Sequence, residues 1–185
     1  MGNGRVLVLA GSTRKESLHR KLAAEAVTAL QAAGLEPVFA DLRDYPLPLY
    51  DADLEAEQGM PAPAKALKEL ARDADAFLIA SPEYNGSYPA VLKNAIDWIS
   101  RPEPEERHLA AFAGKLAAIA SASPGAGGGR RVLRQLRELL GMMRVTVIPE
   151  ELAIARATEA LDPEGLTALA AGLADALGRK QGASA

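Results

Sequence analysis

The chain has 185 residues, a formal net charge of −3 at pH 7 and no cysteine, and 49% of its residues are hydrophobic but only 4% aromatic. The missing thiols exclude disulfides, thiolate zinc sites, iron–sulfur clusters and cysteine nucleophiles. No apolar run reaches the ~18 residues that span a bilayer, no signal peptide is evident, and the charges are interspersed, so we expect a cytoplasmic protein that neither inserts into membranes nor binds nucleic acid.

The first part of the chain alternates between strand-like and helix-like segments. Residues 5–11 (RVLVLAG) are a β-branched and leucine run that predicts a buried strand. Apolar residues at helical spacing predict a helix over residues 17–33, which Gly34 ends. Residues 35–42 predict a second strand, and a long loop rich in proline and aspartate leads to a helix at about 63–74.

The same alternation continues in the middle of the chain. Residues 75–81 (DAFLIAS) predict a third strand, followed by the turn PEYNGSYP at residues 82–89. Apolar residues from 91 to 99 share one helical face. A polar connection then leads to a fourth strand at residues 115–120.

A glycine-rich loop, SASPGAGGGRR, opens the last part of the chain. It precedes a helix marked by leucines between residues 133 and 143, a strand at 145–150 (VTVIPE), and a helix over 166–177. Residues 179–185 are expected to be a disordered tail.

This alternation predicts an α/β fold in a single domain, residues 1–178. Strands too apolar to be half-exposed imply a parallel sheet with helices on both faces. Five such units fit a flavodoxin-like, doubly wound sheet with strand order 2-1-3-4-5. Its topological switch lies between strands one and three, so the loops after these strands are expected to carry the ligand chemistry.

The loop after the first strand has the composition of a phosphate site. The following helix start offers unpaired N–H groups and a partial positive charge. Ser12, Thr13 and Ser17 add hydroxyl donors, and Arg14 adds a guanidinium that matches phosphate oxygens. The alternative is an ordinary turn in which Ser17 caps the helix and Arg14 is solvated. Lys15 and Arg20 are expected to point into solvent.

The loop after the third strand has the composition of a ring-binding edge. Pro82, Gly86 and Pro89 shape a turn with little side-chain bulk, so that backbone amides can approach a flat ring. Tyr84 could supply an apolar wall and Asn85 an amide donor.

Three segments together resemble the NADPH-dependent FMN reductase family, which includes bacterial quinone, azo-dye and chromate reductases. They are GSTRKES after strand one, SPEYNGSYPAVLKNAIDW after strand three and SASPGAGGGRRVLRQLRELL after strand four. The second segment is long and specific, and the similarity extends over roughly residues 5–149.

The resemblance implies that these loops bind FMN. His19 stands where the family usually has an asparagine, so its imidazole could donate a bond in the same place or face solvent. The segment YPLPLYDADLE is similar to a proline-rich loop that borders the substrate cleft and a dimer interface in the family. The cofactor-binding residues assigned on this basis are Ser12, Arg14, Ser17, Leu18, His19, Pro82, Glu83, Tyr84, Asn85, Gly86, Ser121, Ser123 and Gly125.

The resemblance also implies an FMN-dependent NAD(P)H oxidoreductase with ping-pong kinetics and a quinone, azo compound, free flavin or similar small molecule as acceptor. The flavin carries the chemistry, so no catalytic side chain and no metal are expected. NADPH or NADH is the reductant, and a homodimer or homotetramer is expected. The alternative function is a flavodoxin-like FMN electron carrier that serves a protein partner.

Other charged and aromatic residues have simpler interpretations. The acidic residues between 51 and 57 are interpreted as a solvated charge run rather than a metal site. Trp98 is interpreted as a packing residue. The basic stripe of Arg130, Arg131, Arg134 and Arg137 is either a solvated face or, through Arg130 or Arg131, a contact for the 2′-phosphate of NADPH.

Overall fold

A computed structural model describes residues 4–157 and 161–183 of the chain. It contains a parallel sheet of five strands in the order β2-β1-β3-β4-β5, which confirms the predicted flavodoxin-like topology. The strands are β1 (Arg5–Ala10), β2 (Glu36–Ala40), β3 (Ala76–Ala80), β4 (Leu116–Ala122) and β5 (Thr146–Ile154). The helices are α1 (Leu18–Ala32), α2 (Ala52–Gln58), α3 (Ala62–Asp73), α4 (Ala90–Ser100), α5 (Arg130–Met142) and α6 (Pro163–Ala183).

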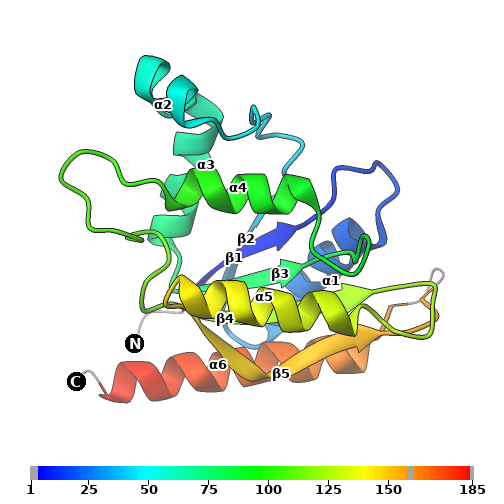
Figure 1. The fold of residues 1–185 in the computed structure, drawn as a ribbon. Coiled ribbons are helices and arrows are strands. Elements are labelled where there is room, and N and C mark those ends of the chain that lie inside the picture. Colours follow the sequence, from blue (N-terminus) through cyan, green and yellow to red (C-terminus); the bar gives the residue numbers. More distant parts are fainter. Residues whose placement is uncertain (1–3, 158–160, 184–185) are drawn as a thin grey trace.

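Helices cover both faces of the sheet (Figure 1). Successive side chains of a strand point to opposite faces, and β1 is apolar on both. Leu7 and Leu9 join a cluster with residues of α3, α4 and α5. Val6 and Val8 join a second cluster with residues of α1 and α6. The sheet is therefore buried between two apolar layers, as its near-continuous hydrophobic strands require.

The carboxyl ends of all five strands lie at one edge of the sheet, where the arrowheads point in Figure 1. Three connections meet there: the β1–α1 loop (residues 11–17), the β3–α4 loop (residues 81–89) and the β4–α5 loop (residues 123–129). Because β1 and β3 are adjacent in the sheet, the first two loops lie on either side of the topological switch, where open α/β sheets bind ligands.

The structure adds a helix, α2, within the long loop that the sequence predicted after β2. The Asp51 side chain caps this helix by accepting hydrogen bonds from the N–H groups of Asp53 (2.8 Å) and Leu54. Glu55 binds the Arg101 guanidinium at 2.9 Å. No residue of α2 is buried, so the apolar spacing that reveals other helices is missing here. Part of the acidic run thus has capping and pairing roles instead of being fully solvated.

The structure also differs from prediction at the C-terminus. Helix α6 continues to Ala183, whereas the sequence analysis expected disorder from residue 179; residues 184 and 185 lie outside the described chain. Leu177 is buried against the second cluster, and the Lys180 ammonium donates to the carbonyl of Gly114. These contacts support a turn of helix that composition alone did not predict.

Neither a metal-binding cluster nor a membrane-spanning helix is found in the described part of the chain. Across residues 4–157 and 161–183, no three His, Asp or Glu side chains are grouped so that they could hold a metal ion. No helix in these ranges combines the length and apolar character needed to cross a bilayer.

Candidate functional site

A cavity of about 160 Å³ lies at the carboxyl edge of the sheet, between the three loops. Leu18 and His19, at the start of α1, also line it. Most of the predicted cofactor-binding residues surround this one space. Its lining residues are Ser12, Arg14, Ser17, Leu18, His19, Pro82, Glu83, Tyr84, Ala122, Ser123 and Pro124.

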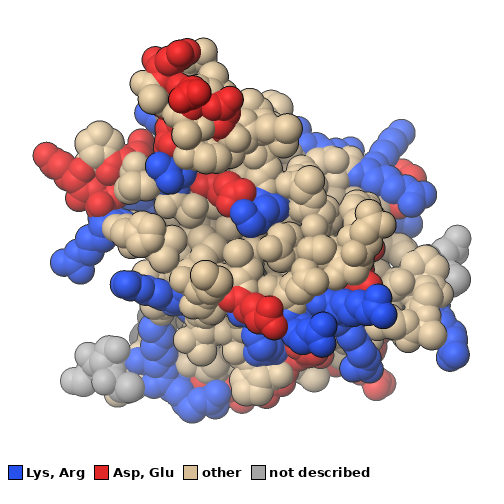
Figure 2. Space-filling view, in the orientation of Figure 1, with Lys and Arg blue, Asp and Glu red and all other residues tan. Residues whose placement is uncertain are grey.

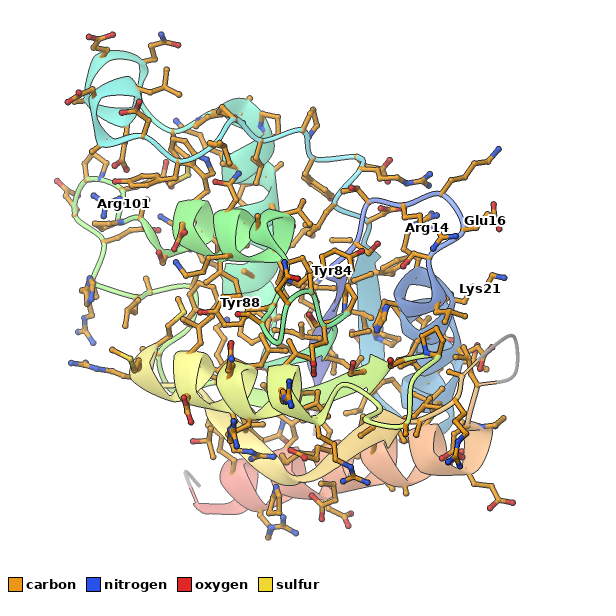
Figure 3. The ribbon with its side chains drawn as sticks, turned by 45° about the vertical axis from the view of Figure 1, so that its right-hand side comes forward. Arg14, Glu16, Lys21, Tyr84, Tyr88 and Arg101 are labelled. Carbon is orange, nitrogen blue, oxygen red and sulfur yellow. The ribbon has the colours of Figure 1, made fainter. Side chains whose placement is uncertain are left out.

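The β1–α1 loop presents hydroxyl groups and a cation to this cavity. Ser12 and Ser17 are buried, and each hydroxyl oxygen accepts a backbone N–H, from Arg14 (3.3 Å) and His19 (3.2 Å) respectively. Because they act here as acceptors, both hydroxyls keep their hydrogens free to donate. Figure 3 shows Arg14 on this loop, with Glu16 and Lys21 projecting outward. Both parts of the alternative interpretation hold, because Ser17 caps the helix and Arg14 is exposed. Both residues also line the cavity, so they stay candidate donors.

His19 is buried, contrary to the solvent-facing option, and connects α1 to the end of β4. Its Nε2 accepts a hydrogen bond from the backbone N–H of Ala122 at 3.1 Å. Burial lowers the pKa of His19 to about 4, so the imidazole is neutral at physiological pH. With Nε2 as acceptor, the proton of the neutral ring is on Nδ1.

Contrary to the prediction, the Arg20 side chain does not point into solvent. Its Nε and Nη2 atoms lie 2.9 and 2.6 Å from Oδ2 of Asp41, the first residue after β2. Its Nη1 donates to the carbonyl oxygen of Lys15 at 2.7 Å. The guanidinium of Arg43 binds the same carboxylate oxygen at 3.1 Å. The β1–α1 loop is therefore tied to the end of β2 through charged groups.

The β3–α4 loop forms a tight hairpin. Tyr84 and Ser87 exchange backbone hydrogen bonds of 2.9 and 3.0 Å, and between them Asn85 and Gly86 have φ angles of 52° and 80°. Positive φ at both central positions is typical of a type I′ turn, for which Asn-Gly is the favoured sequence. Figure 3 shows Tyr84 on this hairpin, where it is 54% exposed.

The hairpin is docked on the start of α5 by side chains of both elements. Gln135 donates to the carbonyl of Gly86 at 2.9 Å and accepts from the Ser87 hydroxyl at 2.6 Å. The Glu83 carboxylate accepts the N–H of Val132 at 3.3 Å. A carboxylate at a helix N-terminus is favoured by the helix dipole. Glu83 thus helps to cap α5, whose own cap position is a glycine without a side chain.

The β4–α5 loop contributes less to the cavity than predicted. Ser123 lines it, and its hydroxyl accepts the N–H of Gly125 at 3.1 Å. Ser121 is fully buried and its hydroxyl has no hydrogen-bond partner among the described residues. A Cβ on Gly129, which has φ 80°, would lie 1.9 Å from this hydroxyl oxygen. Ser121 therefore lies beneath Gly129, outside the cavity lining.

A second cavity of about 350 Å³ adjoins the β1–α1 loop through Thr13. The proline-rich loop forms one wall and α4 the other. Asn94 and Trp98 of α4 both donate to the carbonyl oxygen of Pro48, at 2.8 and 2.9 Å. Trp98 is fully buried, which confirms its packing role. Besides Thr13, the cavity is lined by Leu42, Arg43, Tyr45, Pro46, Leu47, Val91, Asn94 and Ala95.

Basic side chains gather over the first turns of α5, beside acidic ones (Figure 2). Arg137 is not part of a free stripe, because it donates to the carbonyls of Val147 and Ile148 and binds Glu151 at 3.1 Å. Arg131 is exposed, and its Cδ lies 3.9 Å from where a Cβ of Gly86 would be. It therefore lies at the rim of the hairpin.

The donor set at the first cavity fits a flavin mononucleotide. A phosphate dianion suits two serine hydroxyls, the Arg14 guanidinium and the N-terminus of α1. The one acidic residue in the lining, Glu83, already accepts a hydrogen bond from α5. The tight hairpin beside these donors has little side-chain bulk at Gly86, so its backbone groups suit the edge of a flat ring.

Most of the residues that line the cavity were predicted from the sequence, but several contacts that support it were not. Asn85, Gly86, Ser121 and Gly125 are not among the lining residues, whereas Ala122 and Pro124 are. Ala122 and Pro124 belong to no recognisable motif, but their positions on either side of Ser123 could have indicated them. The Arg20–Asp41 pair was also missed, because no local pattern links residues from separate elements.

The chain is similar to one known protein family and to several known proteins. Residues 4–159 match the model of the NADPH-dependent FMN reductase family. The chain is 40% identical over 147 residues to a quinone reductase of Escherichia coli K12, covering 77% of this chain and 72% of that protein. It is 42% identical over 142 residues to an NADPH:quinone oxidoreductase of Arabidopsis thaliana, covering 75% and 68% of the two chains.

A solved structure gives an independent likeness. The flavoenzyme NAD(P)H:(acceptor) oxidoreductase FerB from Paracoccus denitrificans superposes with a TM-score of 0.79 at 30% sequence identity. The match covers 95% of this chain and 98% of that one.

Proposed function

The chain belongs to the NADPH-dependent FMN reductase family, and from this premise we propose an FMN-dependent NAD(P)H oxidoreductase that reduces a quinone or a similar small acceptor. One observation carries the proposal. A single cavity at the carboxyl edge gathers the hydroxyl and cationic donors of the β1–α1 loop and the hairpin of the β3–α4 loop.

Each loop has a distinct task in this proposal. Ser12, Arg14 and Ser17 bind the phosphate together with the N-terminus of α1. The β3–α4 loop, which lines the cavity through Pro82, Glu83 and Tyr84, places backbone groups along the polar edge of the ring. When bound, FMN supplies the redox chemistry, taking hydride from a reduced nicotinamide and delivering it to the acceptor. Backbone N–H groups near the ring offset the negative charge that reduction brings.

We propose ping-pong kinetics, in which the oxidised nicotinamide leaves before the acceptor enters the same cleft beside the flavin. The second cavity meets the β1–α1 loop at Thr13, between the Ser12 and Arg14 that line the first cavity. Leu42, Tyr45, Leu47 and Val91 give the second cavity an apolar wall. Such a wall suits a flat aromatic acceptor. Parallel lines in double-reciprocal plots at several quinone concentrations would support this order, and intersecting lines would contradict it.

Arg130 and Arg131 are the proposed contacts for the 2′-phosphate of NADPH. Both are exposed at the start of α5, and Arg131 lies beside Gly86. The test is the NADPH-to-NADH ratio of kcat/KM in Arg130→Ala and Arg131→Ala. A fall in either variant supports the contact, and an unchanged ratio in both removes it.

We further propose a homodimer or homotetramer. Leu49, on the proline-rich loop that leads away from the second cavity, is 78% exposed, and such an apolar side chain gains by being covered. Light scattering on the eluting protein tests this proposal, because a monomer mass at micromolar concentration would contradict it.

The central test is to purify the protein, record its visible spectrum and identify any released chromophore by mass. Colourless protein is then titrated with FMN, and NADPH oxidation is followed with a benzoquinone. Binding and turnover support the proposal. FMN binding without turnover of any small acceptor would favour an electron carrier, and the absence of any flavin binding would overturn both.

A further inference from the structure

Arg20 occupies the first turn of α1 and contacts two other parts of the chain. Two of its nitrogens lie 2.9 and 2.6 Å from one oxygen of Asp41, and the third donates to the Lys15 carbonyl at 2.7 Å. The β1–α1 loop and the end of β2 are therefore joined through one guanidinium.

The Asp41 carboxylate is a well-built anchor for this contact. Its side chain is only 9% exposed, and it also accepts hydrogen bonds from the backbone N–H of Arg43 (3.1 Å) and from the Arg43 side chain. Burial alone would raise the pKa of Asp41, but the hydrogen bonds from Arg43 and Arg20 hold it below its usual value. The carboxylate therefore stays ionised at physiological pH.

The other end of the contact fixes the backbone of the loop. Lys15 lies between Arg14 and Ser17, the two groups proposed to meet the phosphate. Holding its carbonyl oxygen restricts the path of the segment that presents both of them. Only a guanidinium reaches a carboxylate and a carbonyl in fixed directions at once, since a lysine ammonium is a single point charge on a flexible stem.

We propose that Arg20 is a positioning residue: braced against Asp41, it holds the β1–α1 loop in the phosphate-binding conformation and so sets the preference for FMN over riboflavin. The inference rests on the proposed FMN site. Preorganised donors bind more tightly because less ordering remains to be done on binding.

A simple charge effect makes the opposite prediction for one variant. If only the local net charge mattered, Asp41→Asn would remove a negative charge near the phosphate and tighten FMN binding. If Arg20 is a brace, Asp41→Asn loosens the loop and weakens FMN binding. The sign of the change separates the two explanations.

The experiment measures the dissociation constants of FMN and riboflavin for the flavin-free protein, by quenching of flavin fluorescence. Riboflavin lacks the phosphate, so the ratio of the two constants isolates the phosphate contribution. We expect Asp41→Asn and Arg20→Ala to lower the preference for FMN about tenfold, the loss expected from about 1.4 kcal/mol of binding energy. Riboflavin binding should stay within about twofold in both variants, which also shows that they fold.

Two further variants complete the test. Arg20→Lys keeps the charge but loses the fork, so its FMN preference should fall nearly as far as in Arg20→Ala. Lys21→Ala removes the same charge from the neighbouring, exposed position and should leave the preference unchanged. If Asp41→Asn does not fold, the comparison of Arg20→Lys with Lys21→Ala tests the proposal instead.

The outcomes separate this inference from the proposed function. Wild-type protein that binds no FMN overturns the proposed function. If wild-type protein binds FMN, the brace is overturned by three results: tighter or unchanged FMN binding in Asp41→Asn, an equal loss in Lys21→Ala, or an equal loss of riboflavin binding.

Discussion

The β1–α1 loop and the β3–α4 loop lie on either side of the topological switch but are held in place by different forces. The first is held by ion pairs, in which Arg20 and Arg43 bind the Asp41 carboxylate. The second is held by a backbone hairpin and by the neutral amide of Gln135. The difference indicates that one end of the site depends on charge and the other on shape. Variants at the first end should change selectivity for the phosphate, and variants at the second should change folding or the binding of any flavin.

The largest effect is expected in the third loop of the site, the β4–α5 loop, where Gly129 is restricted by shape and not by charge. Its φ of 80° is unfavourable for alanine, and a Cβ would lie 1.9 Å from the Ser121 hydroxyl oxygen. Gly129→Ala should lower the free energy of unfolding by about 2–5 kcal/mol, from backbone strain and overpacking. Urea denaturation measures the loss. Gly127→Ala is the matched control, because a Cβ there meets nothing within 4 Å. Equal stability of the two variants would contradict the role of shape.

The next effect concerns the protonation state of His19. Its pKa is about 4 in the folded chain and about 6.5 when unfolded. Between these values the unfolded state binds the extra proton, so stability falls as the pH falls from 6.5 to 4, by up to about 3 kcal/mol. His19→Asn should lose less stability over this range in urea titrations at pH 7 and 4.5. His108→Asn, at an exposed histidine, should lose as much as the wild-type protein. If His19→Asn loses as much stability as the wild-type protein, the assignment to His19 is wrong.

Arg14 tests the role of charge directly. Loss of a charge-assisted bond worth about 1.5–3 kcal/mol should weaken FMN binding about 10- to 100-fold in Arg14→Ala. Riboflavin binding should not change, and fluorescence titration measures both. Lys21→Ala again serves as the control. A parallel loss for riboflavin would mean that Arg14 supports the loop instead of the phosphate.

The smallest effect is expected at the hairpin. Gln135→Ala removes both of its hydrogen bonds to Gly86 and Ser87, which should weaken FMN and riboflavin binding equally, about fivefold. The ratio of the two constants should stay unchanged. Arg134→Ala, at the adjacent exposed position, should leave both constants as they are. A selective loss of FMN binding in Gln135→Ala would remove the distinction between the two loops.

The sequence predicted the features that have a local origin. Apolar runs identified all five strands, and their alternation with helices indicated the order of the sheet and therefore its switch point. The Asn85-Gly86 turn and the Ser17 cap are also local, since each is set by neighbouring residues in the chain. These local patterns were enough to locate the cavity.

Contacts between distant residues could not be predicted in this way. His19 meets Ala122 across 103 positions of sequence, and Arg20 meets Asp41 only because β2 lies beside β1. Helix α2 was missed for a different reason. None of its residues is fully buried, and its contacts include the Asp51 cap and the ion pair between Glu55 and Arg101.

The contact between His19 and Ala122 offers a reporter that needs no ligand. The amide proton of Ala122 is held by a ring nitrogen that must stay unprotonated. Its exchange with deuterated solvent should therefore be slow near neutral pH and become less protected as the histidine takes up its proton. A single resolved amide signal would then report on the contact between α1 and β4 in protein without bound cofactor.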